Sequence, residues 1–437
     1  MLCAVEGEVV KKDTLITGLA LFAMFFGAGN LIFPPYLGME SGTEWVLGFL
    51  CFVLIDVVLS CLGIFALNAA GGANAAVEGS IGRVPGLVLN TAVILCTGMV
   101  IAEPRTAATT YEMSIVPLFG DGVGILAFSA VFFAVVLALS IRQTHVVTVI
   151  GKVLTPLLVA CVAVLIVVGV AHPLGDIGAP LSTTVAQDGI SAGYQAMDVL
   201  ACVGFAIMME NAARTAGYTR REDQLKVIAG ASVVAGLLLA VIYGGLTFLG
   251  AASATSFGAG MDRSTLIVAI VQHLLGDTGM AVLAVIVGLA CLTTAIGLTG
   301  ATASYFERVT HGKVPYRVGV IVCVLVSLAL CNLGLNAIIA FAAPILSVVC
   351  PPFMVCVVMV LFKKRMGTEW PIKGAAAGAF VISLLTTIDD TFGALPVMQT
   401  LPLTEFGFNW LPFAVLGGVV GALAFAALRR KSDKAAA

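Results

Sequence analysis

Two neighbouring threonines, Thr293 and Thr294, lie within a long apolar run of this chain. In an apolar helix a threonine hydroxyl commonly bonds a carbonyl oxygen of the preceding turn, and this structural interpretation stays open. Two adjacent hydroxyls can instead supply hard oxygen ligands, the type that a small cation such as Na⁺ binds. The pair is therefore a candidate cation site.

A second candidate lies near the N-terminus, where residues 26–35 read FGAGNLIFPP. Glycine lets a backbone unwind, and unwound backbone at membrane depth is tolerated only where it is buried or lines a cavity. Asn30 can satisfy the freed backbone groups or offer its amide oxygen to a cation. A patch of small residues for close helix packing is the alternative, but Asn30 and the two prolines favour unwinding around Gly27–Asn30.

Gly204, in the run DVLACVGFA at 198–206, is a weaker candidate for a second break. Helix ends exposed by two such breaks suit a zwitterion, because free amide N–H groups attract a carboxylate and free carbonyl groups attract an ammonium group or Na⁺. Phe205 would give the site an apolar wall for an aliphatic side chain. No lysine or arginine is expected at this centre, which argues against an anionic substrate.

Four acidic residues lie within apolar runs: Asp56, Glu103, Asp198 and Glu210. Charged groups inside a membrane are costly, so each is a hypothesis for a proton carrier or for the partner of a base. We interpret Glu103 as a local ion-pair partner of Arg105, and Glu210 as close to a hydrated helix end. Asp56 is the most deeply placed, and the sequence assigns it no role.

Motifs of enzymes are absent from this sequence. It has no Ser-His-Asp order, no HExxH zinc motif, no P-loop and no haem-type histidine pair. The 11 cysteines show no C-x-x-C spacing, so we expect neither a disulfide framework nor a metal centre built on cysteine. An enzyme or a channel is therefore disfavoured, and nothing indicates a nucleic acid or an obligate protein partner.

The composition predicts that these candidate residues belong to a membrane protein. Of the 437 residues, 60% are hydrophobic and 11% charged, with a mean hydropathy of +1.10, whereas a soluble domain has roughly 25% charged residues. A helix that crosses the bilayer needs about 20 mostly apolar residues. We predict twelve transmembrane helices, at 14–38, 43–71, 84–112, 122–141, 146–171, 190–213, 225–252, 278–306, 315–332, 335–362, 371–390 and 409–429.

The basic residues predict the orientation of these helices. With the N-terminus inside, all but two of the 22 lysines and arginines fall in cytoplasmic segments. The exceptions are Arg105, within the third helix, and Arg263, in an outer loop. Positive charge collects on the cytoplasmic side of membrane proteins, so the pattern supports both the count of twelve and a cytoplasmic location of both termini.

The predicted helices form two blocks of five, at residues 1–171 and 190–363, followed by two helices and a tail at 370–437. Because five is odd, the second block enters the membrane upside down relative to the first. Broken helices at matching positions of inverted repeats indicate the binding site of a transporter, and the two candidate breaks lie in the first and sixth helices. A weak likeness between residues 106–112 and 299–307 fits such a repeat.

Residues 19–38, with FGAGNLIFPP at their core, resemble the first membrane helix of the bacterial branched-chain amino-acid carriers, the BrnQ or LIVCS family. Further matches follow in chain order, at 104–107 (PRTA), 151–156 (GKVLTP), 193–198 (GYQAMD) and 289–295 (LACLTTA). The family belongs to the amino acid–polyamine–organocation superfamily. The resemblance implies an all-α integral membrane protein of the bacterial inner (plasma) membrane, with a LeuT-like 5+5 inverted repeat plus two C-terminal helices.

The resemblance also implies a site. By similarity to LeuT-like carriers, the substrate would meet the backbone at Ala28, Gly29, Asn30, Val203, Gly204 and Phe205. The Na⁺ site that most of these carriers share resembles the carbonyl groups of Ala23, Phe26 and Ala290 together with the hydroxyls of Thr293 and Thr294. A second Na⁺ site of the LeuT type would need a hydroxyl where this chain has Leu200, which favours one coupled cation.

The activity implied by the resemblance is import of leucine, isoleucine and valine by secondary symport, with alternating access and no cofactor besides the coupling ion. Na⁺ is the leading hypothesis for that ion. The alternative is an H⁺-coupled symporter or an exchanger of another small neutral amino acid. Uptake of labelled leucine with and without a Na⁺ gradient would separate these hypotheses.

Overall fold

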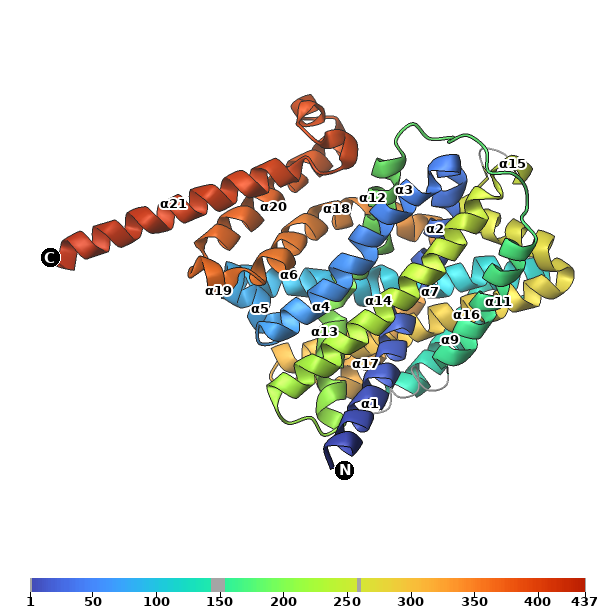
Figure 1. The fold of residues 1–437 in the computed structure, drawn as a ribbon, viewed down its shortest axis with the longest axis horizontal. Coiled ribbons are helices and arrows are strands. Elements are labelled where there is room, and N and C mark those ends of the chain that lie inside the picture. The colour runs from blue at the N-terminus through green and yellow to red at the C-terminus, as the bar shows by residue number, and fades with distance from the viewer. Residues whose placement is uncertain (1, 143–153, 258–260, 437) are drawn as a thin grey trace. The chain divides into compact units, whose positions relative to one another are not determined.

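The computed structural model describes residues 2–142, 154–257 and 261–436, and that part of the chain is helical without a strand (Figure 1). The α-helices are α1 (Leu2–Phe25), α2 (Ala28–Ser41), α3 (Trp45–Val53), α4 (Leu59–Ala69), α5 (Ala73–Ile81), α6 (Arg83–Leu95), α7 (Ala102–Thr110), α8 (Val116–Phe119), α9 (Ile125–Ser140), α11 (Thr155–Ala171), α12 (Val185–Ala196), α13 (Asp198–Thr215), α14 (Arg221–Ala251), α15 (Ala254–Phe257), α16 (Arg263–Val309), α17 (Tyr316–Cys331), α18 (Leu335–Val360), α19 (Lys363–Met366), α20 (Trp370–Phe392) and α21 (Trp410–Ala436). π-Helical segments continue longer helices at η2 (Leu54–Val58), η3 (Cys96–Val100) and η4 (Tyr111–Ile115). Short 3-10 turns are η1 (Gly42–Glu44), η5 (Gly120–Gly122), η7 (Pro396–Thr400) and η8 (Thr404–Phe406).

Eight helical stretches of the described residues are long and apolar enough to cross a membrane. Four shorter apolar helices accompany them, at Asp13–Phe25, Ile125–Ser140, Thr155–Ala171 and Tyr316–Cys331. Helices thus occupy the described part of all twelve predicted ranges, while the count of twelve crossings and the 5+5 arrangement stay predictions. Residues 146–153 of the predicted fifth helix, and with them 151–153 of the family match, lie outside the described residues.

The break predicted in the first membrane helix is confirmed. α1 ends at Phe25, and α2 begins at Ala28 after Gly27, whose backbone is extended at φ −114 and ψ −162. Helical hydrogen bonding stops at Phe26, whose N–H donates to Phe22 O, and resumes with Leu31 N–H to Gly27 O. The unwound part is therefore shorter than the predicted Gly27–Asn30.

The break predicted at Gly204 is wrong. α13 runs through Gly204 without interruption, and the chain breaks earlier, at Met197, which joins α12 to α13 in the left-handed region at φ 72 and ψ 9. A Cβ at Gly204 would lie 2.6 Å from Cβ of Ala301 on α16. This glycine is therefore required for close helix packing, as small residues in membrane helices commonly are.

The longest helix, α16, organises the first compact unit, which comprises Met1–Phe65 and Ile94–Ile339. It bends at Gly276 (φ 58) and packs against α1, α7, α13 and α17. α14 lies along α1 and α2 (Figure 1), where Gly38 and Gly250 let the backbones of α2 and α14 come into contact. This packing fixes the position of α1 and α2, and so of the first break.

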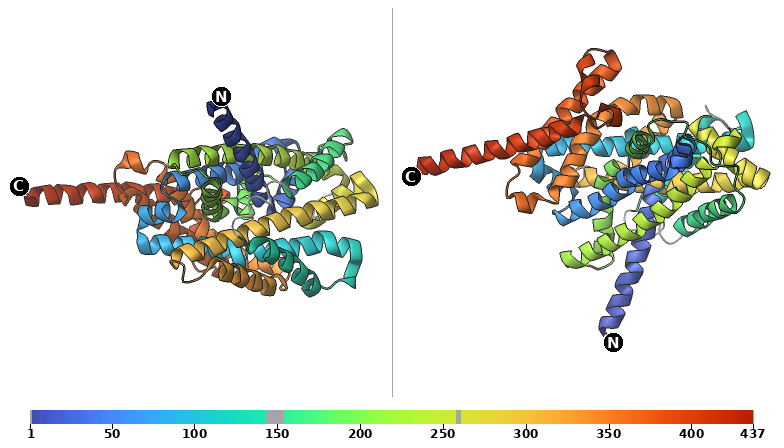
Figure 2. Two further views of the ribbon diagram at one scale, coloured as in Figure 1. Left: turned by 90° about the horizontal axis from the view of Figure 1, so that it is seen from below. Right: turned by 45° about the horizontal axis from the view of Figure 1, so that its top comes forward.

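The second compact unit comprises Ala66–Val93 and Ala340–Ala437. Its largest contact joins α20 and α21, the orange-to-red helices of Figure 2, which lie side by side. Glycines line this contact on both helices, at Gly374, Gly378, Gly417 and Gly421. A Cβ at any of them would meet a backbone carbonyl group of the other helix, which is the behaviour of a small-residue interface.

The grouping by contact does not coincide with the predicted blocks at 1–171, 190–363 and 370–437. Two repeats related by symmetry can have interleaved helices, so a grouping by contact does not test them. The predicted blocks therefore stay a prediction.

Candidate functional site

Oxygen atoms from α1 and α16 converge beside the first break. Thr293 Oγ1 lies 2.8 Å from Ala23 O and 3.0 Å from Ala290 O. Thr294 Oγ1 lies 2.9 Å from Met24 O and 3.4 Å from Ala23 O. Both threonines are buried. The structure thus brings together four of the five residues predicted for the cation site, with Met24 as an addition that the sequence did not suggest.

The structural interpretation of the threonine pair is confirmed for Thr293, which bonds its own helix, while the role of both hydroxyls as cation ligands stays a prediction. Thr293 contacts its own helix at Ala290 as well as α1, whereas the contacts of Thr294 all reach across to α1. The fifth predicted residue, Phe26, lies in the break itself, and its ring stacks on that of Phe22 with centroids 5.4 Å apart. Carbonyl and hydroxyl oxygens that meet at a broken helix are a donor set that fits a hard monovalent cation.

A small cavity lies next to this cluster and has a volume of about 30 Å³. α1, α2, η3, α7, α12, α13 and α16 contribute to its wall, together with Met197 at the second break. It has room for a water molecule, whereas ligand pockets typically measure about 300–1,000 Å³. The cavity could therefore hold a ligand of amino-acid size only if its walls moved apart.

Three of the six predicted substrate residues line the cavity: Gly29, Asn30 and Phe205. The other three are not among its lining residues: Ala28, Val203 and Gly204. The cavity-lining residues of α13 are Asp198, Ala201 and Phe205, which share one face of the helix, and Val203 and Gly204 lie on other faces. Phe25 and Leu298 add apolar surface that the sequence analysis had not identified.

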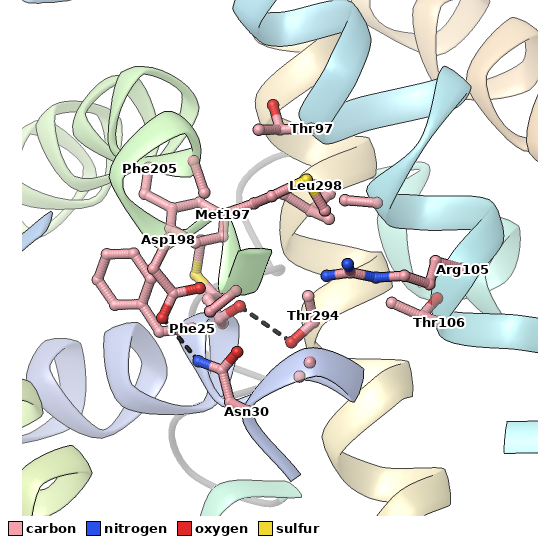
Figure 3. A pocket seen from close by; sticks show the side chains of 16 residues that line it. Phe25, Asn30, Thr97, Arg105, Thr106, Met197, Asp198, Phe205, Thr294 and Leu298 are labelled. Atoms are coloured by element: carbon pink, nitrogen blue, oxygen red, sulfur yellow. Dashed lines mark hydrogen bonds between the residues drawn. The ribbon is translucent and has the colours of Figure 1, made fainter. Parts of the chain in front are cut away.

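Arg105 corrects two expectations. It lines the cavity together with Asp198, so a basic residue does occupy the centre (Figure 3). It does not pair with Glu103, which instead accepts hydrogen bonds from Thr299 Oγ1 at 2.7 Å and Cys323 Sγ at 2.8 Å. Residues two apart on a helix do not face each other, and that rule alone would have excluded the predicted pair.

Asp198 belongs to a buried polar network around the second break. Asn30 Nδ2 donates to Asp198 Oδ2 at 2.7 Å and also to the hydroxyl of Tyr243. The carboxyl group of Asp56, on η2, contacts that of Asp198. Asp56 thus lies behind the cavity wall, and its partner is a second acid.

Glu210 lies in a network of ion pairs at the ends of two helices. Its carboxylate pairs with Arg214 at 2.6 Å and with Arg308 at 3.0 Å. Arg308 also donates to Asn211 Oδ1 at 2.5 Å. These contacts tie the end of α13 to the end of α16, so Glu210 has charged partners that explain its presence without a transport role.

Comparison with known proteins gives one consistent result. The sequence profile of the family described as "Branched-chain amino acid transport protein" matches residues 10–428. The branched-chain amino acid permease BrnQ of Salmonella typhimurium is 34% identical over 415 residues, covering 92% of this chain and 93% of that protein. The permease BraB of Bacillus subtilis is 32% identical over 422 residues, covering 94% and 95%.

Solved structures share the fold at low sequence identity. A Na⁺-coupled sialic acid symporter in a substrate-bound outward-open state aligns with a TM-score of 0.64 at 13% identity, over 94% of this chain and 90% of that one. The nucleobase-cation symporter Mhp1 aligns with a TM-score of 0.58 at 15% identity, over 94% and 93%. MhsT, in complex with L-phenylalanine, gives 0.53 at 14% identity, over 93% and 97%. These likenesses concern the fold alone.

Proposed function

The chain belongs to the family of branched-chain amino acid transport proteins, and from this premise we propose that it is a secondary active transporter that imports leucine, isoleucine and valine with Na⁺. The family and the relatives are transporters, which confirms the prediction that the chain is not an enzyme. The same likeness supports a bacterial plasma membrane, and the distribution of the basic residues supports a cytoplasmic location of both termini.

The oxygen cluster between α1 and α16 is the observation that carries the choice of Na⁺. Its contacts join the end of α1, immediately before the break, to the middle of α16. A cation held there by Ala23, Ala290, Thr293 and Thr294, with Phe26 at the break, would favour the arrangement in which the two helices are close. A ligand shifts a conformational equilibrium only through such a difference in affinity between states.

The substrate would occupy the adjacent cavity, where Gly29 and Asn30 at the start of α2 face Phe205 on α13. Ala28, Val203 and Gly204 lie next to these residues in the chain. Because Thr294 lines the cavity and also contacts Met24 O, one residue serves both places. Binding of Na⁺ and of the amino acid would therefore each make the other more favourable, since coupling between sites is reciprocal.

An H⁺-coupled symporter is the second candidate. The contact between the carboxyl groups of Asp56 and Asp198 favours it, because two neighbouring acids can hold one exchangeable proton between them. Exchange of another small neutral amino acid is the remaining alternative.

Uptake of labelled leucine into proteoliposomes tests the proposal. An inward Na⁺ gradient should drive accumulation, whereas a pH gradient without Na⁺ should not. Equal accumulation with the pH gradient alone would replace Na⁺ by H⁺ and move attention to Asp56. Accumulation of a different solute in place of leucine would overturn the substrate assignment.

The Thr294 hydroxyl offers a more local test. Thr294→Val keeps the size of the side chain but removes the oxygen, and it should raise the Na⁺ concentration for half-maximal leucine uptake at least tenfold. Thr294→Ser keeps the hydroxyl and should stay close to the wild type. Thr278→Val on the same helix is the control for the substitution itself, because Thr278 is exposed and among the described residues its hydroxyl donates to Leu275 O one turn back. An unchanged Na⁺ requirement in Thr294→Val would place the cation elsewhere.

A further inference from the structure

Two opposite charges face each other across the cavity. Arg105 extends from α7 and Asp198 from the first residue of α13, and they enter the cavity from opposite sides (Figure 3). The two groups do not form an ion pair with each other, and the other described residues of the cavity wall are uncharged. The gap between them is where a ligand would lie.

The guanidinium group of Arg105 keeps donors free for a ligand. Its Nη1 donates to the carbonyl oxygen of Gln195 at 3.3 Å, and its Nε has no hydrogen-bond partner among the described residues. A guanidinium group has five N–H donors in a planar fork that matches a carboxylate. Gly29 leaves the room for this group, because a Cβ there would lie 3.1 Å from Arg105 Nη2.

The opposite wall supplies one negative charge. The carboxyl group of Asp56 contacts both the side chain and the backbone N–H of Asp198, and the two carboxyl groups are close enough to share a hydrogen bond. Sharing that bond requires one proton between the two carboxyl groups. An acid pair that shares one proton carries a single negative charge, which would balance the single positive charge of Arg105.

We propose that Arg105 binds the α-carboxylate and Asp198 the α-ammonium group of the transported amino acid, so that the pair recognises a zwitterion. The proposal deepens the function proposed above and rests on it. The carboxylate and the ammonium group of an amino acid are attached to the same carbon atom, and a cavity with one wall of each charge sign can bind both groups without a net charge. Phe25, Phe205 and Leu298 then face the aliphatic side chain.

The experiment compares leucine with two analogues that each lack one charge. Leucinamide has no carboxylate, and 4-methylpentanoate has no ammonium group. Each is measured as a competitor of leucine uptake by the purified, reconstituted protein. In the wild type both should compete far more weakly than leucine, because a buried charge left without its partner is costly.

The variants should remove this discrimination one charge at a time. Arg105→Gln should weaken leucine binding on the order of 100-fold, the effect of truncating one partner of a buried charge pair, while leucinamide loses little, so the two converge. Asp198→Asn should do the same for 4-methylpentanoate. Arg105→Lys keeps the charge and should keep most of the discrimination against leucinamide, which a purely structural role for Arg105 would not predict.

Glu103→Gln is the matched control, because Glu103 is a buried charge on the same helix that faces away from the cavity toward Thr299 and Cys323. It should leave the ratios between leucine and both analogues unchanged. If Arg105→Gln and Asp198→Asn are monodisperse and keep the wild-type ratios, the proposed pair is wrong while leucine transport stands. If the wild type carries another neutral amino acid and not leucine, the proposed function is wrong, and the same variants tested with that amino acid and its amide decide on the pair.

Discussion

The two helix breaks beside the cavity occur at opposite kinds of residue, the smallest at the first break and a large one at the second. At Gly27 the backbone is extended, a conformation open to any residue, yet a Cβ there would lie 2.8 Å from Thr294 Oγ1. At Met197 the backbone is left-handed with φ 72, which favours glycine, yet a large side chain is present and is 97% buried, with 3% exposed. Glycine occurs where space is short, and methionine where the conformation is strained.

The difference reflects what each break must do. The first brings α1 against α16, so that carbonyl and hydroxyl oxygens meet, and a side chain would hold them apart. The second must supply a wall to the cavity, and Met197 does so. Left-handed backbone costs a residue with a Cβ about 1–2 kcal/mol, and the surrounding packing must offset that cost.

Of the changes that test the contrast between the two breaks, a methyl group added at the first break should have the largest effect. Gly27→Ala should raise the Na⁺ concentration for half-maximal leucine uptake about tenfold or more, because the methyl group displaces the Thr294 hydroxyl. Na⁺ titration of leucine uptake measures it. Gly288→Ala on α16 is the control, since a Cβ at Gly288 meets no atom within 4 Å. Equal Na⁺ requirements in the two variants would mean that the space between Gly27 and Thr294 does not affect Na⁺ binding.

The sequence predicted the first break because its signals are local. Two glycines, Asn30 and two prolines lie within ten residues, and each disfavours a regular membrane helix. The resemblance to LeuT-like carriers supplied the pairing of α1 with α16, and the structure brings Ala23 and Thr293 within 2.8 Å of each other. Helix content could likewise be predicted from apolar runs alone.

The second break and the charged pair could not be predicted in this way. Methionine has no preference for left-handed backbone, so nothing near Met197 in the sequence marks a break, whereas Gly204 looked like one and proved to be a packing contact. Arg105 and Asp198 lie on helices that are distant in sequence, and only the tertiary structure brings them to one cavity. Glu103, two residues before Arg105 in the sequence, suggested an ion pair with it. Its carboxylate instead faces Thr299 and Cys323.

An intermediate effect is expected for Gly204→Ala, which tests whether Gly204 is needed for helix packing or for backbone flexibility. Gly204→Ala places a methyl group 2.6 Å from Cβ of Ala301, and overpacking of this kind costs about 1–3 kcal/mol. The melting temperature in detergent should fall. Adding Ala301→Gly should restore part of the loss, because it removes the atom that the new methyl group meets. A double variant no more stable than Gly204→Ala alone would indicate that the glycine is needed for backbone freedom.

The smallest expected effect tests the strain at Met197. Leucine and isoleucine have the same atoms and nearly the same volume, but isoleucine is branched at Cβ, and a branched residue tolerates positive φ poorly. Met197→Ile should therefore be less stable than Met197→Leu by roughly 1 kcal/mol, seen as a lower melting temperature at equal expression. At Ile207, which is buried inside α13, the exchange Ile207→Leu controls for the ordinary difference between the two side chains in a helix. If the Met197 pair differs no more than the Ile207 pair does, the left-handed backbone at the second break costs the protein nothing, and the contrast with Gly27 reduces to the space beside Thr294.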